Sequence, residues 1–267
     1  MSREKAFFDP VAQLPHDVRM PLLGFGTFPM RGAEAREAVG HALRLGYRLV
    51  DTARRYRNED AVGTALKDSK LPRGEVFVTT KMPPDQVGHE RATLEGSLQA
   101  LGLEHVDLWL MHWPPGGYAG VDSWREFIKA RDEGLVRAIG VSNYSLKQVD
   151  TLIAETGVAP AVCQLAWSPT LFDAKLMAGF KERKVVMSAH SPFRQSNLDD
   201  PVIEAIATRH GKTANQVIVR WNLQHGVAVV PKSSVPERMA GNADVFDFEL
   251  SAAEMNELDR SSVAQAR

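Results

Sequence analysis

Cysteine is nearly absent from this sequence. Cys163 is the only one among 267 residues, so no disulfide can form within the chain. It lies in the apolar stretch APAVCQLAW, which predicts a small buried side chain rather than a reactive thiol. The first residues, MSREKAFFDP, lack the apolar core of a secretion signal. We therefore expect a protein of the reducing cytoplasm.

The sequence also lacks an excess of either charge and long apolar runs. Its 32 basic and 33 acidic side chains give a net charge of −1, which predicts no broad attraction to nucleic acid or anionic membranes. No apolar run approaches the ~20 residues of a membrane-spanning helix. Nucleic acid and membranes are therefore not expected as partners.

The motifs of two common enzyme classes are missing. The eight histidines are scattered, without H-x-H or H-E-x-x-H, and there is no cysteine pair. This argues against the alternative of a metal-dependent barrel hydrolase, and we expect no metal. The stretch GFGTFPM does not complete G-x-G-x-x-G, so the Rossmann fingerprint is absent.

Eight short apolar runs alternate with helix-period segments from about residue 20 to residue 240. Because most runs are continuous rather than alternating, they predict strands buried on both faces, as in a parallel sheet. Eight strands with about one helix each favour a (β/α)8 TIM barrel over its main alternative, a doubly wound open sheet. The runs are MPLLGFGT, YRLVDTA, VFVTTKM, VDLWLMHWP, VRAIGVSNY, AVCQLAWSP, VVMSAHSPF and VAVVPKSS.

Capping signals support the helical segments. Thr213 with Gln216 and Ser251 with Glu254 have the spacing of capping boxes. The second box opens one extra helix after the eighth unit. The segment LPHDVRMP, before the first run, is expected to form a small hairpin that covers the barrel bottom. No linker-like tract interrupts the series, so residues 1–267 are expected to form a single α/β domain.

Polar residues follow three consecutive apolar runs. The second run ends in Asp51 with Tyr56 just beyond, the third in Lys81 and the fourth in His112. In a parallel barrel these strand ends share the C-terminal face, where active sites of this architecture lie. Since neighbouring strands are about 4.8 Å apart, we expect the four side chains to share one pocket.

These four residue types suit the reduction of a carbonyl group. A carbonyl that gains a hydride becomes an alkoxide and needs a proton from a nearby acid. A free tyrosine, with a pKa of about 10, is a weak donor at neutral pH. A lysine cation beside it lowers that pKa, and a carboxylate keeps the lysine charged. Histidine can orient the carbonyl through a hydrogen bond.

Each residue also has an ordinary structural interpretation. Asp51 could cap a turn, Lys81 could be a solvated charge, and His112 could be a core histidine bonded to the backbone. Taken singly, these interpretations are preferable. Their occurrence on three consecutive strand ends favours the catalytic interpretation.

Five motifs resemble the aldo-keto reductase superfamily in order and spacing, between about Met20 and Asn242. The length is similar to that of short bacterial members, including the 2,5-diketo-gluconic acid reductase group. The resemblance implies an NADPH-dependent reductase of small aldehydes, α-dicarbonyls, keto esters or keto sugars on a (β/α)8 barrel, usually monomeric. The motifs are GYRLVDTARRYRNEDAVG, VTTKM, VDLWLMHWP, GLVRAIGVSNY and VVPKSSVPERMAGN.

The resemblance also implies roles for individual residues. Tyr56 matches the general acid, Lys81 and Asp51 match the pair that lowers its pKa, and His112 matches the residue that orients the substrate. Further matches concern the cofactor and the substrate pocket. They are Ser142, Asn143 and Gln164 for the nicotinamide carboxamide; Lys232, Ser233, Arg238 and Asn242 for the adenosine 2′-phosphate and adenine; Thr27, His190, Ser191, Phe193 and Ser234 for other cofactor contacts; and Phe28, Met82 and Trp113 for the pocket.

The stretch PKSSVPERMAGN has the chemistry of a phosphate site apart from any resemblance. Lys232 and Arg238 flank the start of a predicted helix, with hydroxyls at Ser233 and Ser234. A dianionic phosphate would find two cations, hydrogen-bond donors and a favourable helix dipole there. An ordinary basic loop before a capped helix is the alternative.

Four positions depart from the family pattern. Arg57 replaces a glycine that commonly follows the tyrosine, and with the two arginines before Tyr56 it either attracts an anionic substrate or remains solvated. Met82 stands where many members carry an aromatic residue, and His190 where an aromatic residue stacks on the nicotinamide. Gly241 replaces an acid that often contacts adenine. A non-catalytic or weakly catalytic NADPH-binding regulatory protein on the same fold therefore remains the alternative function.

Overall fold

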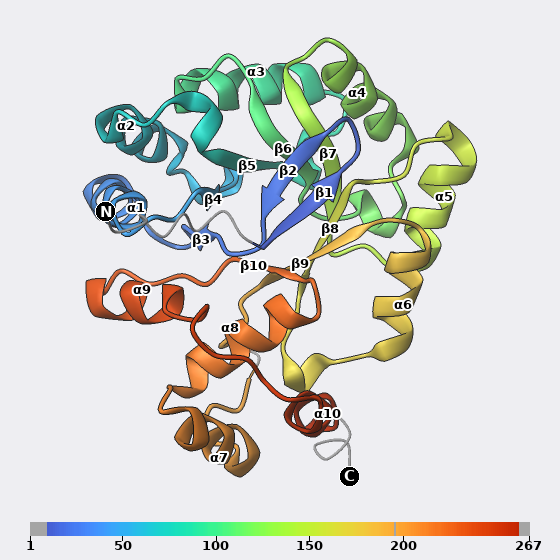
Figure 1. Ribbon diagram of the computed structural model, residues 1–267. Coiled ribbons are helices and arrows are strands. Elements are labelled where there is room, and N and C mark those ends of the chain that lie inside the picture. Colours follow the sequence, from blue (N-terminus) through green and yellow to red (C-terminus); the bar gives the residue numbers. More distant parts are fainter. Residues whose placement is uncertain (1–9, 195, 262–267) are drawn as a thin grey trace.

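The computed structural model describes residues 10–194 and 196–261, and its centre is a parallel sheet of eight strands in the order β10-β9-β8-β7-β6-β5-β4-β3 (Figure 1). The two outermost strands of this order also meet. Gly24 donates its backbone N–H to the carbonyl of Val229 at 2.9 Å, and Val229 donates to Leu22 at 2.7 Å. The sheet is therefore closed on itself. The predicted TIM barrel is confirmed, and the alternative of an open sheet is wrong.

The strands of the barrel differ in length. The bounds are β3 (Phe25–Gly26), β4 (Leu49–Asp51), β5 (Phe77–Met82), β6 (Val106–Met111), β7 (Val136–Ser142), β8 (Val162–Ala166), β9 (Val186–His190) and β10 (Ala228–Val229).

Helices surround the barrel as an outer ring (Figure 1). One long helix follows each strand from β3 to β8, two lie between β9 and β10, and two follow β10. The bounds are α1 (Gly32–Arg44), α2 (Glu59–Ser69), α3 (Glu90–Leu101), α4 (Val121–Asp132), α5 (Leu146–Thr156), α6 (Ala174–Glu182), α7 (Pro201–His210), α8 (Ala214–Gln224), α9 (Pro236–Ala243) and α10 (Ala252–Asp259).

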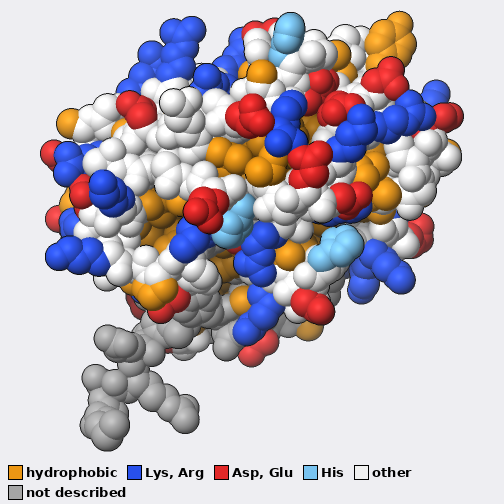
Figure 2. Space-filling model, turned by 90° about the horizontal axis from the view of Figure 1, so that it is seen from above, with side chains coloured by type: hydrophobic (Ala, Val, Ile, Leu, Met, Phe, Trp, Pro, Cys, Tyr) orange, Lys and Arg blue, Asp and Glu red, His pale blue; other side chains and the backbone are white. Residues whose placement is uncertain are grey.

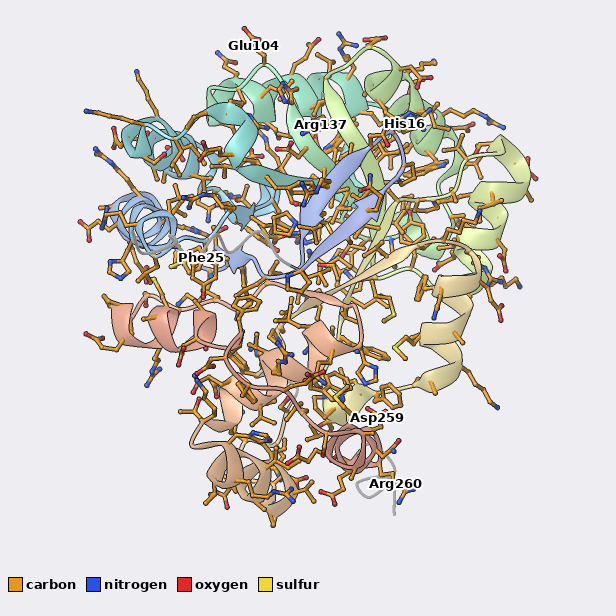
Figure 3. All side chains as sticks on the ribbon, in the orientation of Figure 1. His16, Phe25, Glu104, Arg137, Asp259 and Arg260 are labelled. Carbon is orange, nitrogen blue, oxygen red and sulfur yellow. The ribbon has the colours of Figure 1, made fainter. Side chains whose placement is uncertain are left out.

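The predicted hairpin lies at the N-terminal end of the barrel. Strand β1 (Val11–Leu14) pairs with β2 (Val18–Pro21) in antiparallel register. The hairpin shares a hollow with Phe77 at the start of β5 and with Arg137 near the start of β7, which is labelled in Figure 3. One correction concerns the first predicted strand. Its initial residues belong to β2, residues 22–24 contact Val229 outside any named strand, and Phe25–Gly26 make up β3.

Local capping chemistry agrees with the predicted helix starts. The side chain of Thr213 accepts from the backbone N–H of Gln216 at the start of α8, and Ser251 accepts from Glu254 at the start of α10. Both boxes are reciprocal, so each satisfies two backbone groups that a helix start leaves unpaired. The extra C-terminal helix is confirmed.

Apolar packing between the strands and the outer helices supplies the core. Trp109 of β6 stacks on Phe127 of α4, with ring centroids 3.6 Å apart, and both side chains are buried. Burying a side chain of this size stabilises the fold by roughly 1.5–3 kcal/mol. Acidic and basic side chains are interspersed over the face in Figure 2. Among the described residues, no helix is long and apolar enough to cross a membrane.

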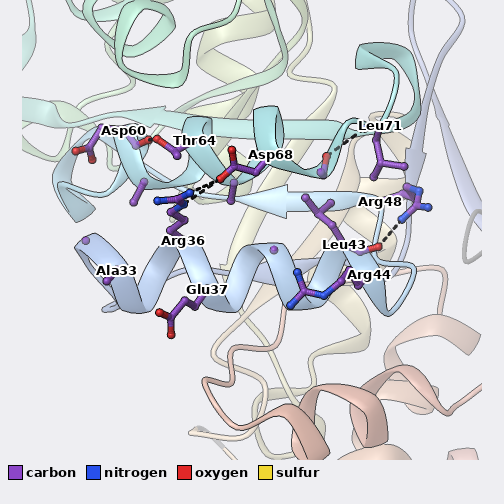
Figure 4. Close-up of a pocket in the computed structure, with 15 residues that line it drawn as sticks. Ala33, Arg36, Glu37, Leu43, Arg44, Arg48, Asp60, Thr64, Asp68 and Leu71 are labelled. Carbon is purple, nitrogen blue, oxygen red and sulfur yellow. Dashed lines mark hydrogen bonds and ion pairs between the residues drawn. The ribbon is translucent and has the colours of Figure 1, made fainter.

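A groove of about 940 Å³ lies on the outside of the barrel, between α1 and α2 (Figure 4). An ion pair joins the two helices there, with Arg36 Nη2 2.6 Å from Asp68 Oδ2. Both partners are about half exposed, so this pair adds little stability. None of the predicted site residues lines the groove.

Candidate active site

The C-terminal end of the barrel brings the four predicted catalytic side chains together. Asp51 ends β4, Lys81 is the penultimate residue of β5, and His112 directly follows β6. Tyr56 ends a short 3-10 helix, η1 (Arg54–Tyr56), which starts three residues after β4. The parallel register therefore places residues that are far apart in sequence at one end of the barrel.

Lys81 is the centre of the cluster. Its side chain is fully buried, and its ammonium donates to Asp51 Oδ1 at 2.5 Å, to the carbonyl of Thr52 at 3.0 Å and to Tyr56 Oη at 3.4 Å. Burial alone lowers the pKa of Lys81, but the attraction and hydrogen bonds of Asp51 and Tyr56 outweigh it, so the net pKa is raised. Lys81 is therefore a buried cation and not a charge exposed to solvent.

The pKa of Tyr56 differs from the sequence-based expectation. Burial raises it, the nearby Lys81 cation lowers it, and Asp51 raises it again, so the net pKa lies above the usual value. Lysine thus acts in the predicted direction, but desolvation of the phenolate outweighs it. The expected net lowering of the Tyr56 pKa is wrong. The phenol is fully protonated at neutral pH, as a proton donor must be.

His112 faces the same cluster as a neutral ring. Its centroid lies 5.7 Å from that of Tyr56, in an edge-to-face arrangement. Burial, followed by the charge of Lys81, lowers its pKa to about 3. Its Nδ1 is buried without a hydrogen-bond partner in the described part of the chain, so the backbone bond of a structural histidine is missing at this atom. A neutral imidazole donates from one nitrogen only.

Residues predicted for the nicotinamide side lie at the ends of β7, β8 and β9 and contact the catalytic residues. Gln164 donates its side-chain amide to Asp51 Oδ2 at 2.8 Å. Asn143 donates to the carbonyl of His112 at 3.0 Å, and its Oδ1 lies 3.4 Å from Nε2 of His190. These contacts join both halves of the barrel into one site.

The other residues predicted to contact the cofactor lie near the catalytic cluster and in the loop after β9. Thr27 donates its hydroxyl to the backbone carbonyl of Asp51 at 3.0 Å. Ser142 is buried, and its Oγ accepts from Asn143 at 3.0 Å. Ser191 Oγ lies 3.2 Å from Nδ1 of the half-buried His190, while the half-buried ring of Phe193 packs against the core.

Two of the three expected pocket residues are open to solvent. Phe28 is 53% exposed and its ring lies 5.1 Å from that of Tyr56, while Trp113 is 50% exposed. Met82 is only 1% exposed and packs in the core. Successive side chains of a strand point to opposite faces, so a residue next to the inward-pointing Lys81 points away from the site. Pro83, not Met82, lines an open hollow at this end of the barrel.

The predicted phosphate-binding residues lie around the start of α9. Lys232, Ser234 and Arg238 are exposed, and the basic pair forms no ion pair with the described residues. Ser233 and Asn242 are buried, and Ser233 Oγ accepts from the backbone N–H of Val235 at 3.1 Å. At Gly241, also in α9, a side chain would meet open space.

A buried polar network behind η1 was missed by the sequence analysis. Asn58 accepts from the hydroxyl of Thr52 at 2.6 Å and donates to the carbonyl of Met30 at 2.9 Å. Glu59 accepts from the hydroxyl of Thr80 at 2.6 Å. These bonds tie the segment that carries the tyrosine to the neighbouring strands. The available signal was the Asn-Glu pair at a helix start, but its partners lie up to about thirty residues away.

Comparison with known proteins agrees with this geometry. The model of the aldo/keto reductase family matches residues 22–262, so the chain belongs to that family of oxidoreductases. The family-level resemblance is thereby confirmed, whereas the resemblance to the 2,5-diketo-gluconic acid reductase group stays a prediction.

Particular relatives cover nearly the whole chain. Morphine 6-dehydrogenase of Pseudomonas putida is 43% identical, over 94% of this chain and 90% of its own. Glyoxal reductase of Bacillus subtilis is 41% identical, over 92% of this chain and 91% of its own. The crystal structure of a Bombyx mori aldo-keto reductase in complex with NADP aligns with a TM-score of 0.86 at 31% identity, over 94% of this chain and 92% of the other.

Proposed function

We propose that this protein reduces the aldehyde or ketone group of a small molecule to the alcohol, with NADPH as the cofactor. The observation that carries this proposal is the buried contact of three groups: the ammonium of Lys81 lies 2.5 Å from a carboxylate oxygen of Asp51 and 3.4 Å from the phenol of Tyr56. A protonated phenol at the mouth of the barrel suits proton delivery to an alkoxide.

The cationic and amide side chains at the C-terminal end of the barrel fit NADPH, a dinucleotide that carries a 2′-phosphate. Lys232 and Arg238 are exposed cations without ion-pair partners in the described residues, and they flank the start of α9. They would hold the 2′-phosphate, and Asn143 with Gln164 would face the nicotinamide end. When bound, NADPH supplies the hydride for the reduction.

The protein's own side chains would supply the proton and orient the substrate. Tyr56 holds the proton at its hydroxyl oxygen, and Lys81 stabilises the phenolate that is left when the proton departs. Asp51, fixed by Gln164, keeps the ammonium in place. The neutral ring of His112 donates one hydrogen bond, which orients the substrate carbonyl toward the phenol.

Oxidation of NADPH, followed by its absorbance in the presence of a panel of small aldehydes and α-dicarbonyls, tests the proposal directly. Turnover with at least one carbonyl compound is expected. Tight NADPH binding without turnover on any of them would instead support the regulatory alternative. The names of the relatives make glyoxal, and morphine in the oxidative direction with NADP, sensible additional compounds to test.

We expect Lys232→Ala and Arg238→Ala each to weaken NADPH binding far more than NADH binding. Each removes a charge-assisted contact to a phosphate that only NADPH carries, which corresponds to a loss of ~1–3 kcal/mol. Dissociation constants from fluorescence titration measure the effect. Lys67→Ala, which removes an exposed lysine on α2, is the matched control. Equal affinity of the unaltered protein for both cofactors would contradict the phosphate site.

We expect the rate of reduction to vary little between about pH 5 and pH 8, because neither His112 nor His190, the two histidines of the candidate site, titrates in that range. Burial lowers the pKa of His112 from 6.5 to about 3, and burial together with Lys81 lowers that of His190 to about 4. Both rings stay neutral until the pH falls toward these values. Profiles of kcat/KM at saturating NADPH measure this. An inflection near the ordinary histidine pKa that disappears in His112→Asn would show the expectation to be wrong.

A further inference from the structure

We propose that Arg31, Arg55 and Arg57 form a subsite for an anionic group, a carboxylate or a phosphate, on the carbonyl substrate. This inference rests on the proposed function and adds the chemical class of the substrate to it.

The three arginines surround a hollow at the catalytic end of the barrel. The hollow has a volume of about 560 Å³, and its lining includes Pro83 and Asp85. The lining comes from the loops after β3, β4 and β5, the same end of the barrel that carries Tyr56. Arg55 and Arg57 are the immediate chain neighbours of Tyr56. The hollow therefore adjoins the segment that carries the proton donor.

The charge of the hollow is not neutralised by the protein. Arg54 also lines it, but its guanidinium is held by Glu59 at 3.4 Å and by the carbonyl of Gly96 at 3.3 Å. Arg31, Arg55 and Arg57 form no ion pair with any residue that the structure describes. Asp85 is the single acidic residue of the lining. Three guanidinium groups thus face one carboxylate.

The charge of one of these arginines also acts on a residue of the catalytic cluster. The charge of Arg55 contributes to the low pKa of His112, after burial, Lys81 and His190. The residue that is expected to orient the carbonyl therefore lies within the field of this arginine. An anion bound in the hollow would hold its carbonyl group close to both His112 and Tyr56.

The backbone of Arg57 gives a second reason to assign it a role. Its φ angle is 55°, in the left-handed region that glycine adopts without steric cost. Its side chain is exposed and lines the hollow. A strained position that carries a free charge beside the proton donor is consistent with a binding function.

The chemistry of guanidinium specifies the ligand. Its planar fork of N–H donors matches the paired oxygens of carboxylate and phosphate. Clustered cations also raise the local concentration of anionic substrates, an effect that salt weakens. We therefore expect the protein to prefer carbonyl compounds with a negatively charged group over uncharged compounds of the same shape.

Two substrate pairs test this preference at saturating NADPH. The first is 4-carboxybenzaldehyde with methyl 4-formylbenzoate, and the second is glyceraldehyde 3-phosphate with glyceraldehyde. The unaltered protein is expected to show a higher kcat/KM for the charged member of at least one pair. Each of Arg31→Gln, Arg55→Gln and Arg57→Gly is expected to lower that value by roughly two- to fivefold, and the triple variant by about tenfold or more.

The controls separate the subsite from general effects. The uncharged member of each pair should change less than twofold in the triple variant. Arg19→Gln removes an exposed arginine from the hairpin at the opposite end of the barrel and should leave both pairs unchanged. High salt should reduce only the rate of the charged substrates.

Each outcome decides between the possibilities. A preference confined to the first pair assigns the subsite to carboxylates, and one confined to the second assigns it to phosphates. Equal rates for charged and uncharged members, or a charge preference that survives in the triple variant, would overturn the inference while leaving the reductase activity intact. If none of the four compounds is reduced although another member of the carbonyl panel is, the inference is overturned and the proposed function stands.

Discussion

Tyr56→Phe is expected to lower kcat for carbonyl reduction by about 10²–10⁴-fold, because it removes the proton donor. The hydroxyl accepts a hydrogen bond from Lys81 at 3.4 Å, and the ring keeps its contact with Phe28 in the variant. NADPH affinity should remain nearly unchanged. Single-turnover reduction of an aldehyde, combined with a fluorescence titration of NADPH, measures both quantities.

Tyr47→Phe is the matched control for this variant. It also removes a buried phenolic hydroxyl, one that donates to the carbonyl of Met239 at 2.9 Å, away from the cluster. Its activity should be retained even if its thermal stability falls. Full activity in Tyr56→Phe would refute the assignment of the proton donor.

The second large effect is expected for Lys81→Met, which removes the charge that stabilises the tyrosine anion. Loss of such a group lowers kcat by about 10²–10³-fold. The variant also leaves the carboxylate of Asp51 buried without its cation, so we expect the free energy of unfolding to fall by roughly 3–5 kcal/mol. Denaturant unfolding and steady-state kinetics measure the two losses.

The double variant Asp51→Asn/Lys81→Met distinguishes the catalytic from the structural contribution. With both charges removed, no uncompensated carboxylate remains in the interior, and most of the lost stability should return. The activity should stay lost because the ammonium is still missing. Recovery of activity together with stability would show that Lys81 acts only on folding.

The fold was largely predictable because its signals are local. Continuous apolar runs gave the strands, and the hydroxyl and amide spacing at Thr213 and Ser251 gave the helix starts. The lengths of β3 and β10 were not predictable. Apolar residues such as Leu22 and Val230 are buried beside these two-residue strands without belonging to them, so hydropathy alone cannot mark the strand ends.

The location of the candidate site was predictable from one rule, that parallel strands end at one face. The pKa of Tyr56 was not, because the sequence gives its charged neighbours but not the depth of its burial. The same limit applies to Asn58 and Glu59, whose hydrogen-bond partners are brought near only by the closed barrel. Met82 was predicted to line the pocket, but the alternation of side chains along β5 directs it into the core.

The hydrogen bond from Gln164 to Asp51 has a consequence for attempts to shorten or transplant this scaffold. The two residues belong to β8 and β4, which stand four strands apart in the closed sheet and thus on opposite walls. A fragment that runs from β3 to His112, just after β6, would contain every one of the four reactive side chains, yet the amide that anchors the carboxylate would be gone. The chemistry is therefore inseparable from circular closure, and a half-barrel grafted into another protein would inherit the residues without their alignment.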